Sequence, residues 1–154
     1  MSTSYVMPEP KAISALLEMI FGDGVKVDKA AADVTGKTVA TFVDDSDRLV
    51  ALCACDDQFV GYSGGALSMI PPDAVNEILA GGEMTPVMRD NFYEVMNICS
   101  KLLMSDSSAH LRLHKTLPAE QAGAAIAELE AATGIGFQVD IPRYGAGCMH
   151  FLVT

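Results

Sequence analysis

The chain has 154 residues, half of them hydrophobic, and its 10 Lys and Arg against 20 Asp and Glu give a formal net charge of −10. This length suits a single domain over residues 1–154, with a core large enough to fold without disulfides or a structural metal. The acidic balance argues against nucleic acid and anionic membranes as partners, because both attract Lys and Arg, and it suits a partner that offers cationic groups.

No apolar stretch is long enough to cross a membrane, and the N-terminal residues 1–10 lack the basic flank and apolar run of a signal peptide. We therefore expect a cytoplasmic protein.

The first half of the chain predicts a helix followed by a strand and a hairpin. Apolar residues recur at helical spacing over 9–21, and a short strand is expected at 24–30. Residues 37–45 alternate as a strand does, and 49–55 are apolar on both faces. Asp44 to Asp47 predict a tight turn, so these two strands should pair antiparallel.

The second half predicts further strands and three helices. Residues 59–62 and 65–70 are expected as strands around a glycine turn, and Pro71 and Pro72 open a helix that Gly81 and Gly82 end. The remaining expected elements are a long helix at 86–104, a strand at 109–115, a helix at 119–132, and strands at 136–141 and 146–153. No internal repeat is evident. This order favours an α+β fold with a largely antiparallel sheet and helices packed on it.

The helix at 86–104 separates into an apolar face and a polar face. At about 100° per residue, one stripe comprises Met88, Phe92, Val95, Cys99 and Leu102. On the opposite side, four polar residues fall within an arc of about 60°: Asp90, Glu94, Asn97 and Lys101. Periodicity alone favours a different interpretation, the solvated face of an ordinary amphipathic helix.

The polar face resembles the signature of the CheC/CheX family of chemotaxis phosphatases. Members carry Asp or Ser, three residues, Glu, two residues and Asn on a surface helix, and this sequence has Asp90, Glu94 and Asn97 at that spacing. The preceding run, GYSGGALSMIPPDAVNEILAGGE, also resembles the family, so the likeness covers about 55–104. The resemblance implies a single CheC-like domain of the one-site CheX type, since the helices at 9–21 and 119–132 lack the motif.

The resemblance also implies a function. The chain would hydrolyse the aspartyl phosphate of a phosphorylated CheY-type response-regulator receiver in chemotaxis or two-component signalling. Asn97 would orient the attacking water, Glu94 would pair with the receiver's lysine, and Asp90 and Lys101 would lie in the docking surface. The domain would have no cofactor of its own, because magnesium would come from the receiver, and single-site members commonly form homodimers.

Lys101 departs from the family pattern, which often has glycine four residues after the Asn. A long cation there could crowd the receiver or contact its acidic pocket. The alternative hypothesis is a non-catalytic binding or dimerisation module in which Glu94 and Asn97 are merely solvated.

Four other patterns have structural and functional interpretations. Gly61 to Gly65 match the nucleophile elbow Gly-x-Ser-x-Gly, with Ser63 as nucleophile and His150 as base, but we favour a hairpin turn because the strands are expected to be antiparallel. His110 and His114 have metal-ligand spacing without an acidic partner, and we expect surface or half-buried histidines.

Asp44, Asp45 and Asp47 resemble the start of a calcium loop but lack its glycine and closing glutamate. Cys53 and Cys55 should share one strand face, and core packing is favoured over a metal or redox role. We expect no metal site.

Overall fold

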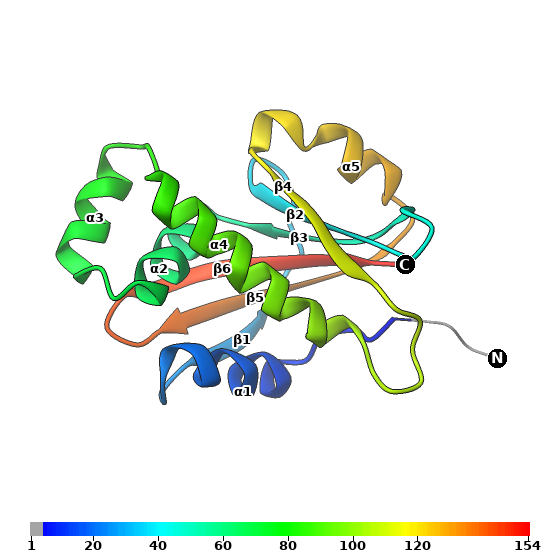
Figure 1. Cartoon of the computed structure of the whole chain (residues 1–154), viewed down its shortest axis with the longest axis horizontal. Helices are drawn as coiled ribbons and strands as arrows, with labels where there is room; N and C mark the ends of the chain where they lie inside the picture. Colours follow the sequence, from blue (N-terminus) through cyan, green and yellow to red (C-terminus); the bar gives the residue numbers. More distant parts are fainter. Residues whose placement is uncertain (1–4) are drawn as a thin grey trace.

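In the computed structural model, which describes residues 5–154, α-helices pack on a single β-sheet (Figure 1). The α-helices are α1 (Pro10–Phe21), α2 (Asp57–Leu67), α3 (Pro72–Ala80), α4 (Pro86–Cys99) and α5 (Gly123–Glu128), with 3₁₀ turns at Ser100–Leu103 and Ala119–Gln121. The strands are β1 (Lys26–Ala30), β2 (Thr38–Val43), β3 (Leu49–Cys55), β4 (Arg112–Leu117), β5 (Thr133–Ile141) and β6 (Gly145–Val153). Within these residues no helix is long and apolar enough to cross a bilayer.

The strands form one antiparallel sheet in the order β1-β5-β6-β3-β2-β4. The predicted α+β class is therefore confirmed, as is the hairpin of β2 and β3, in which Thr38 pairs with Cys55. Its turn is held by the Asp44 carboxylate, which accepts from the backbone N–H groups of Ser46 and Arg48 at 2.9 and 3.0 Å.

The two halves of the sheet repeat the same arrangement. Counted inward from one edge the strands are β1, β5 and β6, and counted inward from the other edge they are β4, β2 and β3, so β1, β2 and β3 correspond to β4, β5 and β6. An approximate two-fold axis therefore passes between the central strands β3 and β6. It relates the half α1-β1-β2-β3 to the half α4-β4-β5-β6, so α1 and α4 occupy equivalent places. This repeat is absent from the amino-acid pattern.

Both faces of the sheet are covered. Helices α1, α2 and α4 lie over one face, where Leu17, Phe59, Phe92 and Phe151 belong to one buried cluster (Figure 1). The opposite face carries a smaller cluster around Leu52, covered by α5 and by the crossover at 31–37. β3 is buried on both faces, as its unbroken apolar run predicts.

The strands predicted at 59–62 and 65–70 are wrong, because this segment is helix α2. Asp56 caps it by accepting from Phe59 N at 2.9 Å. The glycines serve helix packing rather than a turn: a Cβ on Gly64 would lie 2.5 Å from the Met88 carbonyl oxygen, and one on Gly65 would lie 2.5 Å from Val75. Their missing side chains let α2 pack closely against α3 and α4.

Two other helices are shorter than predicted. The segment expected at 119–132 divides into the 3₁₀ turn and α5, and β5 already begins at Thr133. The long helix expected at 86–104 is α-helical only to Cys99 and then tightens into a 3₁₀ turn.

Candidate functional site

Helix α4 begins at a capped proline and packs one side into the core. The Thr85 hydroxyl accepts from Met88 N at 3.2 Å, and Pro86 occupies the first turn, where its missing N–H costs nothing. The predicted apolar stripe is confirmed by its burial; the buried residues of α4 are Met88, Phe92, Val95, Met96 and Cys99.

The opposite side of α4, which we call the outer face, presents Asp90, Glu94 and Asn97 to solvent. The structure thus confirms that these side chains are exposed on one helix, with Glu94 and Asn97 three residues and so about 60° apart around the axis. The ion pairs within residues 5–154 lie elsewhere, joining Asp33 to Lys37, Asp44 to Arg48, Asp45 to His110 and Asp47 to Arg112. The Glu94 carboxylate is therefore not committed to a cation in that part of the chain.

The outer face rests on a firmly held helix. The Asn91 amide donates from Nδ2 to the Gly64 carbonyl at 2.8 Å and to Ser68 Oγ at 2.6 Å, which ties α4 to α2. Sequence reasoning missed Asn91 because its partners lie more than 20 positions away and α2 was taken for strands. A helix fixed in this way can hold a polar pair in one place against a partner.

Lys101 is also exposed, but it lies beyond the end of α4. In a continuous α-helix it would follow Asn97 at an offset of about 40°, whereas the 3₁₀ turn widens that offset to about 80°. The cation therefore lies farther from the Asn97 side of the helix than the sequence spacing suggests.

The nucleophile elbow is not formed. Ser63 is buried inside α2 and donates from Oγ to the Phe59 carbonyl at 2.6 Å, so the expected hairpin turn is wrong here too. His150 lies on β6, where its Nδ1 accepts from Asp33 N at 3.1 Å. The two side chains therefore make separate structural bonds: Ser63 bonds within α2, whereas His150 holds the backbone at Asp33.

The cysteines behave as core residues. The sulfurs of Cys53 and Cys55 lie 3.6 Å apart on one side of β3, as the strand period predicts, and Cys99 faces the same core. Burial raises the pKa of the Cys99 thiol and that of Cys55, so both remain protonated at neutral pH.

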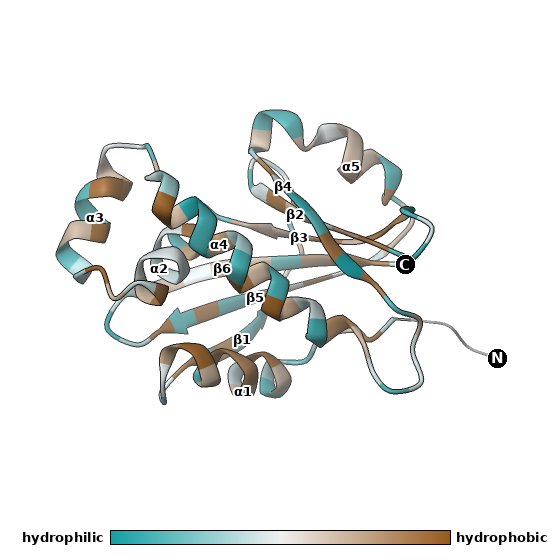
Figure 2. Cartoon of the chain, in the orientation of Figure 1, coloured by the Kyte–Doolittle hydropathy of each residue, from teal (hydrophilic) through white to brown (hydrophobic). Residues whose placement is uncertain are grey.

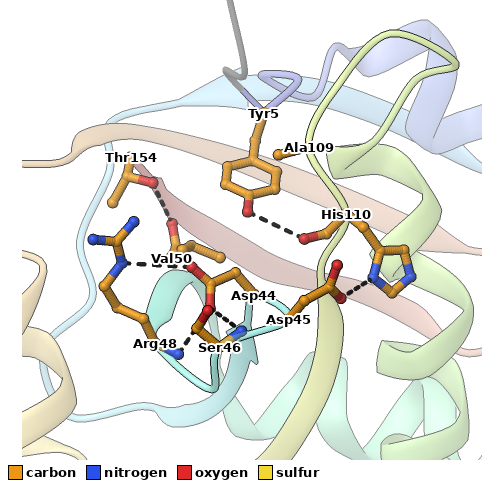
Figure 3. Close-up of a pocket in the computed structure, with 9 residues that line it drawn as sticks. All are labelled: Tyr5, Asp44, Asp45, Ser46, Arg48, Val50, Ala109, His110 and Thr154. Atoms are coloured by element: carbon orange, nitrogen blue, oxygen red, sulfur yellow. Dashed lines mark hydrogen bonds and ion pairs between the residues drawn. The ribbon is translucent and has the colours of Figure 1, made fainter.

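A polar cavity of about 410 Å³ lies beside the β2–β3 turn (Figure 3). His110 Nδ1 and Asp45 Oδ1 are 2.8 Å apart on its rim, and the Tyr5 hydroxyl donates to the His110 carbonyl. In the part of the chain that the structure describes, no three His, Cys, Asp or Glu side chains gather as metal ligands would. The turn predicted at Asp44 to Asp47 is confirmed, because Asp47 N donates to the Asp44 carbonyl at 3.0 Å.

A second cavity, of about 540 Å³, runs along the flank of α4. Arg89 and Phe92 line it on the helix side, and Leu117 and Glu120 line it across from them. It adjoins the helix that carries the outer face without including Asp90, Glu94 or Asn97.

Comparison with known proteins gives a fold rather than a sequence family. No protein-family model matches the chain, and no curated protein matches it. FliM from H. pylori, solved in a complex with SpeE, aligns with a TM-score of 0.62 and 8% identity over 94% of this chain and 80% of its own. The FliM middle domain of Vibrio alginolyticus aligns at 0.54 with 11% identity, covering 94% and 87% of the two chains.

CheX from Borrelia burgdorferi, solved with CheY, BeF3 and magnesium, aligns at a TM-score of 0.45 with 10% identity over 91% of each chain. The chain thus has the fold of the FliM middle domain, and CheX is among the structures that match.

Proposed function

We propose that this domain hydrolyses the aspartyl phosphate of a response-regulator receiver, and that it does so with the outer face of α4. The observation that carries the proposal is the joint exposure of Glu94 and Asn97 on one rigidly held helix, with Asp90 beside them. The resemblance of this face to the CheC/CheX signature supports the same assignment, and the fold is compatible with it.

The chemistry requires little from the domain beyond positioning. In the reaction a water oxygen bonds to phosphorus, the bond between phosphorus and the aspartyl oxygen breaks, and inorganic phosphate and a free carboxylate result. Phosphoryl transfer of this kind depends on alignment and charge stabilisation rather than on a covalent nucleophile. An amide such as that of Asn97 can accept from the water and donate to a phosphoryl oxygen, which fixes the line of attack.

The Glu94 carboxylate would help to dock the receiver. A receiver of this class presents a lysine beside its phosphoaspartate, and a carboxylate at the centre of the contact would pair with it and set the register. Asp90 lies one turn away on the same face and strengthens its negative potential. Lys101, beyond the helix end, would contact acidic groups of the receiver, which would also supply the magnesium ion. Such a receiver works in the cytoplasm, and so would this domain.

A non-catalytic binding module on the same fold is the second candidate. The better structural match to FliM, one chain of which is solved in a complex with another protein, favours this alternative. Both hypotheses use a protein-docking surface. In the binding module Glu94 and Asn97 are merely solvated, and no phosphoryl group is hydrolysed.

Phosphate release from a panel of phosphorylated receivers, measured with and without the domain, tests the proposal. We expect at least one receiver to lose phosphate faster when the domain is present at substoichiometric concentration, because a catalyst turns over. A receiver that binds the domain while its phosphate loss stays at the spontaneous rate would establish the binding module instead.

A further inference from the structure

Four large apolar side chains are exposed within residues 5–154, and three of them lie on α4 or beside it. On α4, Val87 is 54% exposed and Tyr93 is 37% exposed, and Met69 is 77% exposed in the turn between α2 and α3. The fourth, Met19, is on α1. Figure 2 shows how teal and brown residues alternate along α4. Exposed apolar side chains that gather around polar ones are typical of a protein-docking surface.

Val87 and Tyr93 border the outer face of α4 on opposite sides. Val87 precedes Asp90 by three residues and Tyr93 follows it by three, so each is turned about 60° from Asp90, one in each direction. Glu94 and Asn97 fall between these two borders, at about 40° and about 20° from Asp90. The three polar side chains therefore share an arc of about 120° that has one exposed apolar side chain at each border.

Met69 extends the apolar border on the Val87 side. It follows Ser68, whose Oγ accepts from the Asn91 amide at 2.6 Å, and Asn91 lies one helical turn after Val87 on α4. The backbone of Met69 has a φ of 56°, a left-handed conformation that favours glycine. A methionine at this position therefore costs folding energy without the gain of burial, which indicates a role for its side chain at the surface.

The outer face is convex, because it is the exposed side of a helix. Neither of the cavities of about 410 and 540 Å³ includes Asp90, Glu94 or Asn97. A small ligand is bound by a concave site that surrounds most of its surface. A free acyl phosphate would find no such walls on this face, whereas a protein that carries its phosphoryl group in a cleft would supply them by closing over the helix.

We propose that the receiver docks on Val87, Tyr93 and Met69, and that these contacts restrict the reaction to a phosphoryl group held by a protein. The inference rests on the proposed function and adds to its site three residues that the polar signature does not include. The receiver is the occupant because this apolar border is continuous with the polar residues that would reach its phosphoryl group.

Charge supports the same occupant, since Asp90 and Glu94 are acidic and the receiver presents a lysine beside its phosphoaspartate. The apolar and polar parts of the surface have separate tasks. Burial of the apolar side chains supplies affinity, whereas the polar groups set the register and act on the phosphoryl group.

Binding to receivers that carry BeF3 and magnesium tests the docking surface, because this phosphoryl mimic is not hydrolysed and docking is measured apart from catalysis. The double variant Val87→Ala/Tyr93→Ala should raise the dissociation constant at least about tenfold. Met19→Ala, which shortens an exposed side chain on α1, is the control and should bind as wild type does. With a phosphorylated receiver that the domain dephosphorylates, the double variant should raise KM and leave the rate at saturation unchanged.

Met69→Gly separates docking from folding. Glycine suits the left-handed backbone, so the urea midpoint should stay the same or rise while the dissociation constant for the receiver increases. If Met69 had only a structural role, the variant would lose stability and keep its affinity.

Acetyl phosphate tests the substrate class, and its hydrolysis should stay at the spontaneous rate when the domain is present. Hydrolysis as fast as that of a receiver would overturn the proposal, as would a failure of every receiver to bind. A receiver that the wild type and the double variant bind and dephosphorylate equally would leave the proposed function standing and remove the docking surface. Weaker binding by the double variant, without hydrolysis by the wild type, would retain the docking surface and refute the phosphatase.

Discussion

Glu94 and Asn97 lie one helical turn apart, yet the proposed mechanism gives them different tasks. The Glu94 carboxylate would form an ion pair with the receiver's lysine when the two proteins first bind and keep it throughout the reaction. The Asn97 amide would act only on the attacking water. Both side chains are exposed, and exposed substitutions usually change the free energy of unfolding by less than about 0.5 kcal/mol. Effects on activity can therefore be separated from effects on folding.

Replacing Glu94 with Ala should weaken docking and turnover together. The ion pair forms at encounter and persists in the transition state, so we expect kcat/KM to fall by roughly tenfold or more, with a weaker receiver affinity in a parallel titration. Glu77→Ala, an exposed glutamate on α3, is the matched control and should behave as wild type. If the two variants were indistinguishable, Glu94 would have no part in docking.

His150 gives the fold a dependence on pH. Its buried ring holds the crossover at 31–37 by accepting from Asp33 N, and burial, assisted by the nearby Lys37 cation, lowers its pKa below the ordinary value of 6.5. Asp33 and Asp56 oppose that shift without reversing it. As pH falls through 6.5, the unfolded chain takes up the proton before the folded protein does.

The free energy of unfolding should therefore decrease as pH is lowered from about 7.5 to 5.5, and His150→Gln should flatten that decrease. Urea denaturation at a series of pH values measures it. Parallel pH profiles for wild type and variant would show that His150 does not titrate differently in the folded state.

At the residue scale, the exposure of a side chain could be predicted where it follows from the periodicity of the helix or strand that carries it. The positions of Asp90, Glu94 and Asn97 follow from helical geometry, as does the burial of Cys99. Ser63 and His150 could not be placed in this way, because their partners depend on which elements meet in space. Asn91 escaped prediction for the same reason.

Helix α2 shows where local preference and tertiary packing disagree. Its glycines weaken a helix, so Gly61 to Gly65 favour a turn when taken alone. The packing of α2 against α3 and α4 requires those same glycines, because any Cβ would collide. Asp56, which caps α2, and the acidic Asp57 after it are the local signals that could have predicted a helix.

Gly64→Ala should destabilise the protein despite the better helix propensity of alanine. The new Cβ would lie 2.5 Å from the Met88 carbonyl oxygen, and backbone cannot move aside as a flexible side chain does. The cost of overpacking exceeds the gain in helix propensity, so we expect the free energy of unfolding to fall by about 1–2 kcal/mol. The urea midpoint measures this loss.

Gly123→Ala is the control for that measurement, because a Cβ there meets nothing within 4 Å. It should leave stability unchanged or raise it by up to about 1 kcal/mol. A Gly64→Ala protein as stable as the Gly123→Ala protein would mean that α2 and α4 are not in close contact.

At the scale of the whole molecule, an approximate two-fold axis relates the two halves of the fold. It places α1 and α4 in equivalent positions, although α4 exposes Asp90, Glu94 and Asn97 where α1 exposes Ala12, Ala15 and Met19. The sheet class was predictable from strand and helix order. The internal symmetry was not, because it lies in the pairing of strands that are far apart in the sequence, and the amino-acid pattern shows no repeat.

The central claim is that the outer face of α4 hydrolyses receiver phosphate, and Asn97→Ala tests it most directly. In single-turnover measurements with a receiver that the domain dephosphorylates, we expect the variant to lose roughly 100-fold or more of the rate while keeping nearly normal affinity. Asn76→Ala, an exposed position on α3, should keep the wild-type rate. Equal rates for wild type and Asn97→Ala, both above the spontaneous loss, would contradict the account.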